Sequence, residues 1–116
     1  MHAKKEDLPV VADMPGLFES RQAQWGGLTA AIEVVHKAHD FTEEFAELPT
    51  GRCQAPHWGY LVEGKLRILY ADHEEVIKAG EIYYMSPGHI PVAEEECSII
   101  EFSGSEEYAK TLSIAD

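Results

Sequence analysis

Basic residues and cysteine are both scarce in this chain, and long hydrophobic runs are absent. Nine Lys and Arg residues face 21 Asp and Glu residues among 116, which gives a formal net charge of −12 at pH 7. No basic stripe offsets this charge, so the composition argues against binding to nucleic-acid phosphates or to anionic membrane surfaces. Hydrophobic residues make up 45% of the chain, an ordinary share for a folded protein. We therefore expect one acidic globular domain.

Two further absences bear on the cellular compartment. Residues 1–7 lack the apolar segment of a secretory signal, and no run approaches the ~20 apolar residues that span a bilayer. The two cysteines, Cys53 and Cys97, are too few for a disulfide framework. We expect a cytoplasmic protein with reduced thiols, and a single Cys53–Cys97 disulfide is the less favoured alternative.

The chain does contain a succession of short hydrophobic segments that are separated by Gly, Pro and charged residues. Several of them are β-branched or aromatic, as is typical of strands. Strands alternating with long helices are not indicated, so a parallel α/β sheet is not expected. The pattern predicts an all-β sandwich or barrel. The predicted strands cover residues 28–36, 58–62, 65–70, 74–77, 82–85 and 97–102.

The ends of the chain and one turn complete the predicted organisation. Residues 1–18 read as an N-terminal arm and residues 19–116 as the single domain. The apolar part of the arm, residues 8–12, could lie along a sheet or cover a sheet edge of a second copy, so we expect a homodimer. Glu63-Gly64 has the form of a two-residue hairpin connection. A short helix is predicted from Ser105 to about residue 112, with Ser105 as its N-cap.

Two segments of the chain resemble the two sequence motifs of the cupin superfamily. Gly64 matches the glycine that ends the first motif, and residues 80–88 resemble the second motif, a glycine followed by an aromatic strand and a Pro-x-Gly-like turn. The sequence resembles a subgroup of small single-domain bacterial cupins with a Cys-x-x-Pro-His-x-Gly-Tyr segment and a Pro-Gly-His turn. The resemblance covers residues from about 20 to 105. It implies a double-stranded β-helix, or jelly-roll barrel, often with a metal inside.

The usual cupin metal ligands do not stand at their usual places. His57 occupies the position of the family's Glu, Cys53 that of its second His, and Pro91 that of the His in the second motif. His89 instead follows directly after Gly88. A shifted set of Cys53, His57 and His89 therefore takes the place of the standard one.

The shifted set has the chemistry of a metal site. Cys53 and His57 are four residues apart, so an extended strand would place both side chains on one face. Thiolate and imidazole are good zinc ligands, and imidazole also suits iron and nickel. We expect a divalent metal, zinc, iron or nickel, held by Cys53, His57 and His89 with one open position, the pattern of catalytic sites. The alternatives are a small buried thiol and hydrogen-bonded barrel histidines.

Five further side chains are candidates for lining a pocket beside these residues. Aromatic walls are common in pockets, although most aromatic side chains of such a barrel belong to its core. His36 could enter as a fourth ligand by strand parity. Glu101 interrupts an apolar strand, and alternation favours a solvent-facing carboxylate over a buried acid that orients a histidine. The five candidates are Trp58, Tyr60, Tyr84, His36 and Glu101.

The functional prediction is a small cupin that binds a metal ion, a small molecule or both inside the barrel, with no reaction assigned. Two alternatives stay open. The first is a metal-free ligand-binding or sensor module, because imidazoles are missing from the standard positions. The second is a structural dimer whose barrel is packed solid. Fold alone does not decide among them.

Overall fold

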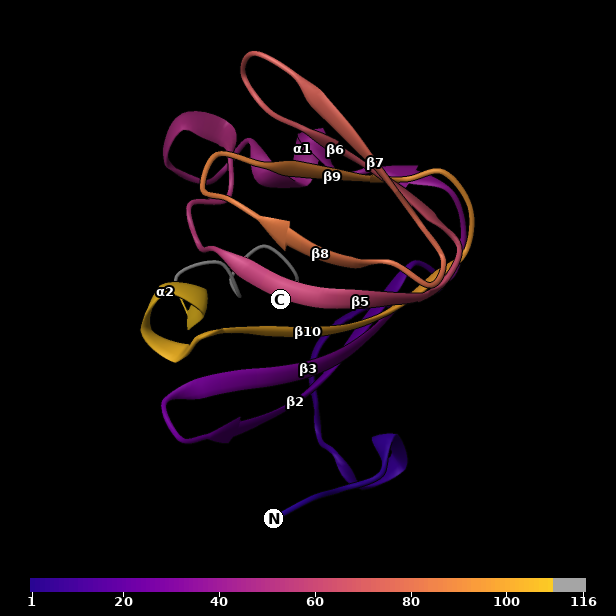
Figure 1. Ribbon diagram of the computed structural model, residues 1–116, viewed down its shortest axis with the longest axis vertical. Helices are drawn as coiled ribbons and strands as arrows, with labels where there is room; N and C mark the ends of the chain where they lie inside the picture. Colours follow the sequence, from indigo (N-terminus) through magenta and orange to yellow (C-terminus); the bar gives the residue numbers. More distant parts are fainter. Residues whose placement is uncertain (110–116) are drawn as a thin grey trace.

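The computed structural model describes residues 1–109, and their regular secondary structure is almost wholly β-strand (Figure 1). The all-β fold predicted from the sequence is thus confirmed. The strands are β1 (Val10–Met14), β2 (Phe18–Trp25), β3 (Leu28–Val35), β4 (His39–Asp40), β5 (His57–Glu63), β6 (Lys65–Leu69), β7 (Glu74–Lys78), β8 (Ile82–Met85), β9 (Ile90–Ala93) and β10 (Cys97–Gly104).

The strands form two antiparallel sheets, which lie one above the other in Figure 1. The six-stranded sheet has the order β1-β2-β3-β10-β5-β8, and the four-stranded sheet has the order β4-β9-β6-β7. Short helical turns connect or end the strands. They are η1 (Lys5–Asp7), α1 (Thr42–Phe45), η2 (Pro49–Gly51) and α2 (Ser105–Ala109).

The core lies between the two sheets and follows the alternation of side chains along each strand. Leu61 on β5 and Ile68 on β6 are completely buried, and Leu66, Ile77 and Ile99 pack in the same cluster. Successive residues of a strand point to opposite faces, so every second residue counted from these core residues also points between the sheets. On β5 and β10 the inward positions include His57 and Glu101, so the core brings polar side chains with it.

The structure corrects the expected hairpin at Glu63-Gly64. Strand β5 pairs with β8 and β10, whereas β6 pairs with β7 and β9, so the chain crosses from one sheet to the other at this point. Gly64 has a φ of 97°, and a Cβ at this position would collide with the Glu96 carbonyl oxygen and approach the Cys97 sulfur to 2.7 Å. The glycine is therefore required by a sheet-to-sheet crossing packed against the chain before β10.

Within the N-terminal region, residues 10–14 of the predicted arm form the edge strand β1, which pairs with β2 of the same chain. The sequence did not predict β2 as a strand. Its inward positions include Ser20 and Gln22, both buried, and its outward positions include Glu19 and Arg21. No hydrophobic alternation is present there to identify it. The helix starts at Ser105 as predicted, and its predicted extension to about residue 112 lies outside the described residues.

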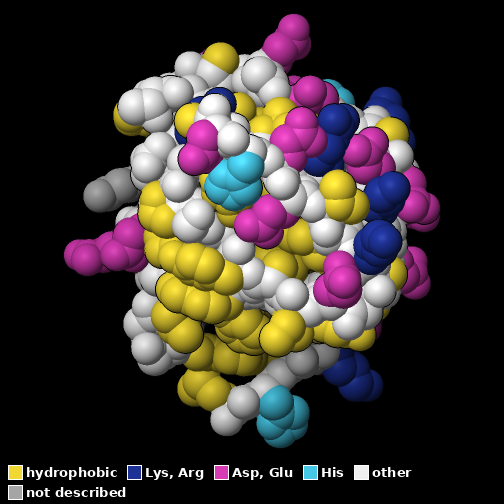
Figure 2. Space-filling model, turned by 45° about the horizontal axis from the view of Figure 1, so that its top comes forward, with side chains coloured by type: hydrophobic (Ala, Val, Ile, Leu, Met, Phe, Trp, Pro, Cys, Tyr) yellow, Lys and Arg dark blue, Asp and Glu magenta, His cyan; other side chains and the backbone are white. Residues whose placement is uncertain are grey.

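The charged side chains are unevenly spread over the surface. Figure 2 shows hydrophobic side chains gathered over a broad area at the left and below the centre of one face, with most Lys and Arg side chains toward the right. Among the described residues, no helix is long and apolar enough to cross a membrane.

Candidate metal centre

Backbone hydrogen bonds hold two distant segments side by side at one end of the barrel. The Cys53 carbonyl accepts hydrogen bonds from the N–H groups of Gly88 (2.8 Å) and His89 (3.3 Å), and the Cys53 N–H donates to the His89 carbonyl (3.0 Å). Gly88 has a φ of 97°, a conformation that glycine adopts readily and other residues rarely do. The turn between β8 and β9 therefore delivers His89 directly opposite Cys53.

The three predicted ligands meet inside the barrel. One side-chain donor atom from each of Cys53, His57 and His89 lies within 4.8 Å of the other two, and all three residues are buried. The Cys53 Sγ lies 3.6 Å from the His57 Nε2. The two imidazole rings are 4.9 Å apart between centroids and make an angle of 65°. The geometric expectation for these residues, a thiol and two imidazoles in one shared space, is met.

Hydrogen bonds on the far side of each ring fix how the imidazoles can act. The His89 Nδ1 lies 2.8 Å from the Ser86 carbonyl oxygen, which can only accept, so Nδ1 carries the proton and Nε2 keeps its lone pair. The His57 Nδ1 lies 2.6 Å from the Ser103 hydroxyl, and its Nε2 is directed at the Cys53 sulfur. Such contacts are those that orient histidine ligands in metal sites.

Burial sets the protonation states of the cluster. It raises the pKa of the Cys53 thiol to about 11, and the nearby negative charges of Glu101 and Glu33 act in the same direction. Burial also lowers the pKa of His57 to about 4. It does the same for His89, where the charge of His57 adds to the effect. At neutral pH the metal-free cluster is thus a protonated thiol and two neutral imidazoles, and neutral imidazole is the form that binds metals.

Glu101 is buried, which corrects the expectation that its side chain faces solvent. Burial raises the pKa of its carboxyl to about 7. The Tyr83 hydroxyl donates a hydrogen bond to the Glu101 Oε1 (2.7 Å), and the Glu101 Oε2 lies 3.9 Å from the His57 Nδ1. Gly59 makes this arrangement possible: it stands opposite both Tyr83 and Glu101 in the sheet, and a Cβ there would collide with the Tyr83 ring. The alternation rule failed because the outward positions of β10, not the inward ones, are the more apolar.

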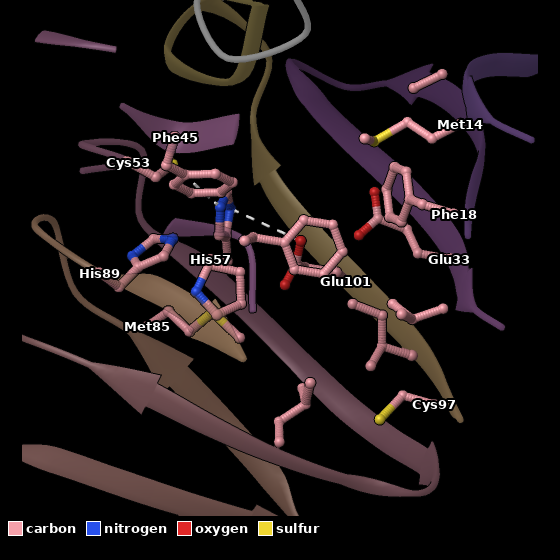
Figure 3. Close-up of a pocket in the computed structure, with 16 residues that line it drawn as sticks. Met14, Phe18, Glu33, Phe45, Cys53, His57, Met85, His89, Cys97 and Glu101 are labelled. Carbon is pink, nitrogen blue, oxygen red and sulfur yellow. Dashed lines mark hydrogen bonds and ion pairs between the residues drawn. The ribbon is translucent and has the colours of Figure 1, made fainter. Parts of the chain in front are cut away.

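A cavity of about 120 Å³ extends from the cluster into the barrel. Figure 3 shows Cys53, His57 and His89 at one side of it, Glu101 near the middle, and Glu33 with Phe18 at the other side. Its walls are mostly apolar and come from both sheets, and no Lys or Arg of the described chain lines it. The lining residues are Ala12, Met14, Phe18, Glu33, Val35, Phe41, Phe45, Cys53, His57, Leu66, Met85, His89, Pro91, Cys97, Ile99 and Glu101.

Four of the five pocket-lining candidates do not reach this cavity. Trp58, Tyr60 and Tyr84 alternate with inward residues of β5 and β8, so their side chains lie on the outer face and are 49%, 39% and 48% exposed. His36 follows the end of β3 and is exposed, so it cannot serve as a fourth ligand. Only Glu101 of the five lines the cavity.

The sequence reasoning missed three polar residues of the site. Glu33 lies on the inner face of β3 and is buried, as are Ser103 on β10 and Tyr83 on β8. Glu33 shares its strand parity with Ala31 and Val35, which was the available signal. That signal was ambiguous because the alternate residues of the strand, which face the other side of the sheet, are equally apolar.

Comparisons with known proteins identify the fold. No protein-family model matches the sequence, and no curated protein matches it significantly. Solved structures do match. An RmlC-like cupin from Shewanella frigidimarina NCIMB 400 is 17% identical with a TM-score of 0.64, over 92% of this chain and 93% of that chain. The EutQ protein of Clostridium difficile is 10% identical with a TM-score of 0.56, over 90% and 80%. Iron(II) HppE is 8% identical with a TM-score of 0.62, over 89% of this chain and 59% of that one.

This protein has the cupin fold, as the resemblance of its motifs predicted. Within that fold it carries a buried group of one cysteine and two histidines that has the donor atoms to hold a metal. The likeness to these structures is one of fold, because their sequence identities are low.

Proposed function

We propose that this cupin binds one divalent transition metal through Cys53, His57 and His89, and a small molecule in the cavity beside it. The observation that carries the proposal is the convergence of three buried donor atoms within 4.8 Å at one side of a cavity. A sulfur and two imidazole nitrogens suit zinc, iron or nickel. The residues of the cluster and the cavity do not identify a reaction, so the proposal is limited to binding.

The spacing between the donor atoms of Cys53 and His57 fits a metal ion. Around a tetrahedral zinc, a sulfur at about 2.3 Å and a nitrogen at about 2.0–2.1 Å lie roughly 3.5 Å apart. The Cys53 Sγ and the His57 Nε2 are 3.6 Å apart. Three protein ligands would leave a coordination position open toward the cavity. A bound metal would supply Lewis acidity there, and binding would release the proton of the Cys53 thiol.

The cavity favours a small neutral or cationic ligand. Its volume is close to the ~150 Å³ of an apolar cavity that admits benzene. The acidic groups that line it are the carboxyls of Glu33 and Glu101, and no Lys or Arg stands among the lining residues. An anionic ligand would therefore rely on the metal alone for neutralisation. This cavity also argues against the solid-packed structural barrel.

A metal-free binding module is the second candidate, and one observation favours it. The 3.6 Å contact between Cys53 and His57 also fits a thiol that donates a hydrogen bond to a neutral imidazole. The outer nitrogens of His57 and His89 have partners in Ser103 and Ser86. The hydrogen bonds of the cluster are thus satisfied without a metal. The metal-binding and the metal-free candidate functions therefore differ in metal affinity alone.

The deciding experiment measures metal content and thermal stability in the protein expressed without a His tag. After incubation with zinc, iron(II) or nickel and removal of excess metal, atomic emission should find about one equivalent of one metal per chain. A chelator should lower the melting temperature, and that same metal should restore it. The His57→Ala, His89→Ala double variant should lose both effects.

The matched control removes two histidines outside the cluster. His36 is exposed and the His73 side chain is half exposed, so the His36→Ala, His73→Ala variant should bind metal as the wild type does. Wild-type protein that stays metal-free under all three conditions would select the metal-free module. Stoichiometric metal in the His57, His89 double variant would show that the site lies elsewhere.

A further inference from the structure

The six-stranded sheet has an exposed apolar face on the side away from the cavity. Trp58 stands opposite both Phe102 and Tyr84 in the sheet, and Tyr60 stands opposite both Ile100 and Ile82. Directly opposite residues of antiparallel strands share a face, so these side chains form one continuous surface across β10, β5 and β8. The Trp58 and Tyr84 rings are 5.2 Å apart between centroids. We call this surface the outer sheet face.

Over four neighbouring strands the outer sheet face carries a single charged side chain, Glu63, which stands opposite Ser98 at the end of β5. Strand β3 extends it beyond β10, because Phe102 pairs with Ala30 and Ile100 with Ile32. Its border lies on β2, where Glu19 and Arg21 form an ion pair. The chain has 21 acidic residues, so the scarcity of charge on this face distinguishes it from the rest of the surface. The outward residues are Leu28, Ala30, Ile32, Val34, Trp58, Tyr60, Val62, Ile82, Tyr84, Ser98, Ile100, Phe102 and Gly104.

We propose that the outer sheet face is the interface of a homodimer, in which the same face of a second copy packs against it. Eight large hydrophobic residues of the face are 36% to 84% exposed: Leu28, Trp58, Tyr60, Val62, Ile82, Tyr84, Ile100 and Phe102. With side-chain areas of about 150–250 Å² each, they offer on the order of 700 Å² per chain. A standard stable interface takes about 800 Å² from each partner. Monomeric proteins rarely expose an apolar patch this large.

Charge and symmetry select a second copy as the occupant. Each chain has a formal charge of −12, so two copies repel one another except across a surface that lacks acidic groups. The outer sheet face provides that surface apart from Glu63 at its margin, and under a two-fold axis its apolar centre is its own complement. A charged partner would find only Glu63, at the margin of the face, to pair with. Trp and Tyr are also the residues that enrich the centres of protein interfaces.

This interface differs from the one expected from the N-terminal arm. In the structure β1 pairs with β2 of its own chain at the far edge of the sheet from β8, and Leu8 and Ala12 are buried there. Leu8 and Ala12 are thus used within the protomer, whereas Val10 and Val11 between them are 43% and 41% exposed. The outer sheet face involves neither the cavity nor the cluster, so the dimer stands or falls independently of the proposed metal.

The test introduces a charged residue on the outer face of each sheet in the full-length chain. The molecular mass of each variant is then measured by light scattering coupled to size-exclusion chromatography. The wild type should have twice the mass of one chain, and Trp58→Lys should convert it to a monomer. Val76→Lys is the matched control, because Val76 is exposed to a similar degree (47% against 49%) but lies on β7 of the other sheet. Circular dichroism of both variants establishes that they remain folded.

A second variant covers the case in which Trp58→Lys fails to fold. Ile82 is 84% exposed and hardly contributes to the protomer core, so Ile82→Lys should fold and also dissociate the dimer. A wild-type monomer at every concentration overturns the proposal. So does a wild-type dimer that survives Ile82→Lys but dissociates with Val76→Lys.

Discussion

The two sheets of this protein distribute polar and apolar side chains in opposite ways. The four-stranded sheet is apolar inside, with Leu66 and Ile68 buried, and charged outside, where Arg67 pairs with Glu74 and Glu94. The six-stranded sheet buries polar side chains between the sheets, namely Glu33, His57, Glu101 and Ser103, and exposes large aromatic ones on its outer face, namely Trp58, Tyr60, Tyr84 and Phe102. The difference shows that a polar residue between apolar neighbours can mark the interior of a barrel when that interior holds a site.

This contrast explains which parts of the structure the sequence could predict. Strands with clear alternation, such as β6, were found because burial and hydrophobicity agree in the four-stranded sheet. Cys53, His57 and His89 were found because thiol and imidazole are rare and stood in two motifs. In the six-stranded sheet both parities are apolar, so Glu101 was assigned to the wrong face and Glu33 was missed.

Turn residues were equally misleading at Gly64, where contacts with distant parts of the chain determine the backbone path. Gly64 was correctly identified as a residue that takes a positive φ. A glycine is required there because the chain before β10 approaches it closely where the chain crosses from one sheet to the other. The strands that pair with β5 lie far along the chain, so no local sequence signal reveals this crossing. Strand β2 was invisible because Ser20 and Gln22 point inward there.

The largest expected effect contrasts the two faces of a single strand, β5. Leu61 is completely buried and Val62 next to it is 43% exposed. Leu61→Ala should lower the free energy of unfolding by about 2–5 kcal/mol because it leaves a cavity between the sheets. Val62→Ala, measured by urea unfolding at a concentration low enough to keep the chain monomeric, should cost less than about 1 kcal/mol. Equal losses would contradict the assignment of the faces.

The next largest effect is the pH dependence caused by Glu101. Its carboxyl keeps its proton up to about pH 7 when folded but releases it near its ordinary pKa of 4.5 when unfolded. Glu101 therefore binds more protons in the folded state in this window, and its own contribution to stability should fall by about 3 kcal/mol as the pH rises through it. His57 and His89, with pKa values lowered from 6.5 to about 4, act oppositely, and their contribution is lost as the pH falls through that range.

Glu101→Gln isolates the first of these two contributions. The variant keeps an acceptor for the Tyr83 hydroxyl but has no carboxyl to ionise. In chelator-treated protein, its free energy of unfolding should rise relative to the wild type between pH 4.5 and 7, as followed by urea titration. Parallel curves for the two proteins would mean that Glu101 is ionised at no cost, and thus accessible to water.

A smaller effect is expected from the hydroxyl that contacts His57. Ser103→Ala removes the partner of the His57 Nδ1 and should weaken metal binding by about 10–100-fold, measured by competition with a chelating dye. Ser98→Ala is the control, because Ser98 lies on the outer face of the same strand. If both variants bind metal equally well, the hydroxyl does not orient the ring.

The smallest effect concerns the charged outer face of the four-stranded sheet. Arg67 lies 3.7 Å from Glu74 and 2.8 Å from Glu94, and all three side chains are partly exposed. Solvent-exposed ion pairs contribute little, so Arg67→Ala should cost less than about 1 kcal/mol of unfolding free energy. A loss near that of Leu61→Ala would show that the outer face of this sheet is structurally as important as its core.

The most direct test of the cluster is X-ray absorption spectroscopy at the zinc edge of the zinc-loaded protein. The account predicts one sulfur neighbour at about 2.3 Å and two imidazole nitrogens at about 2.0–2.1 Å. The sulfur signal should disappear in Cys53→Ser. A first shell made only of oxygen and nitrogen in the wild type would contradict a metal centre built from Cys53, His57 and His89.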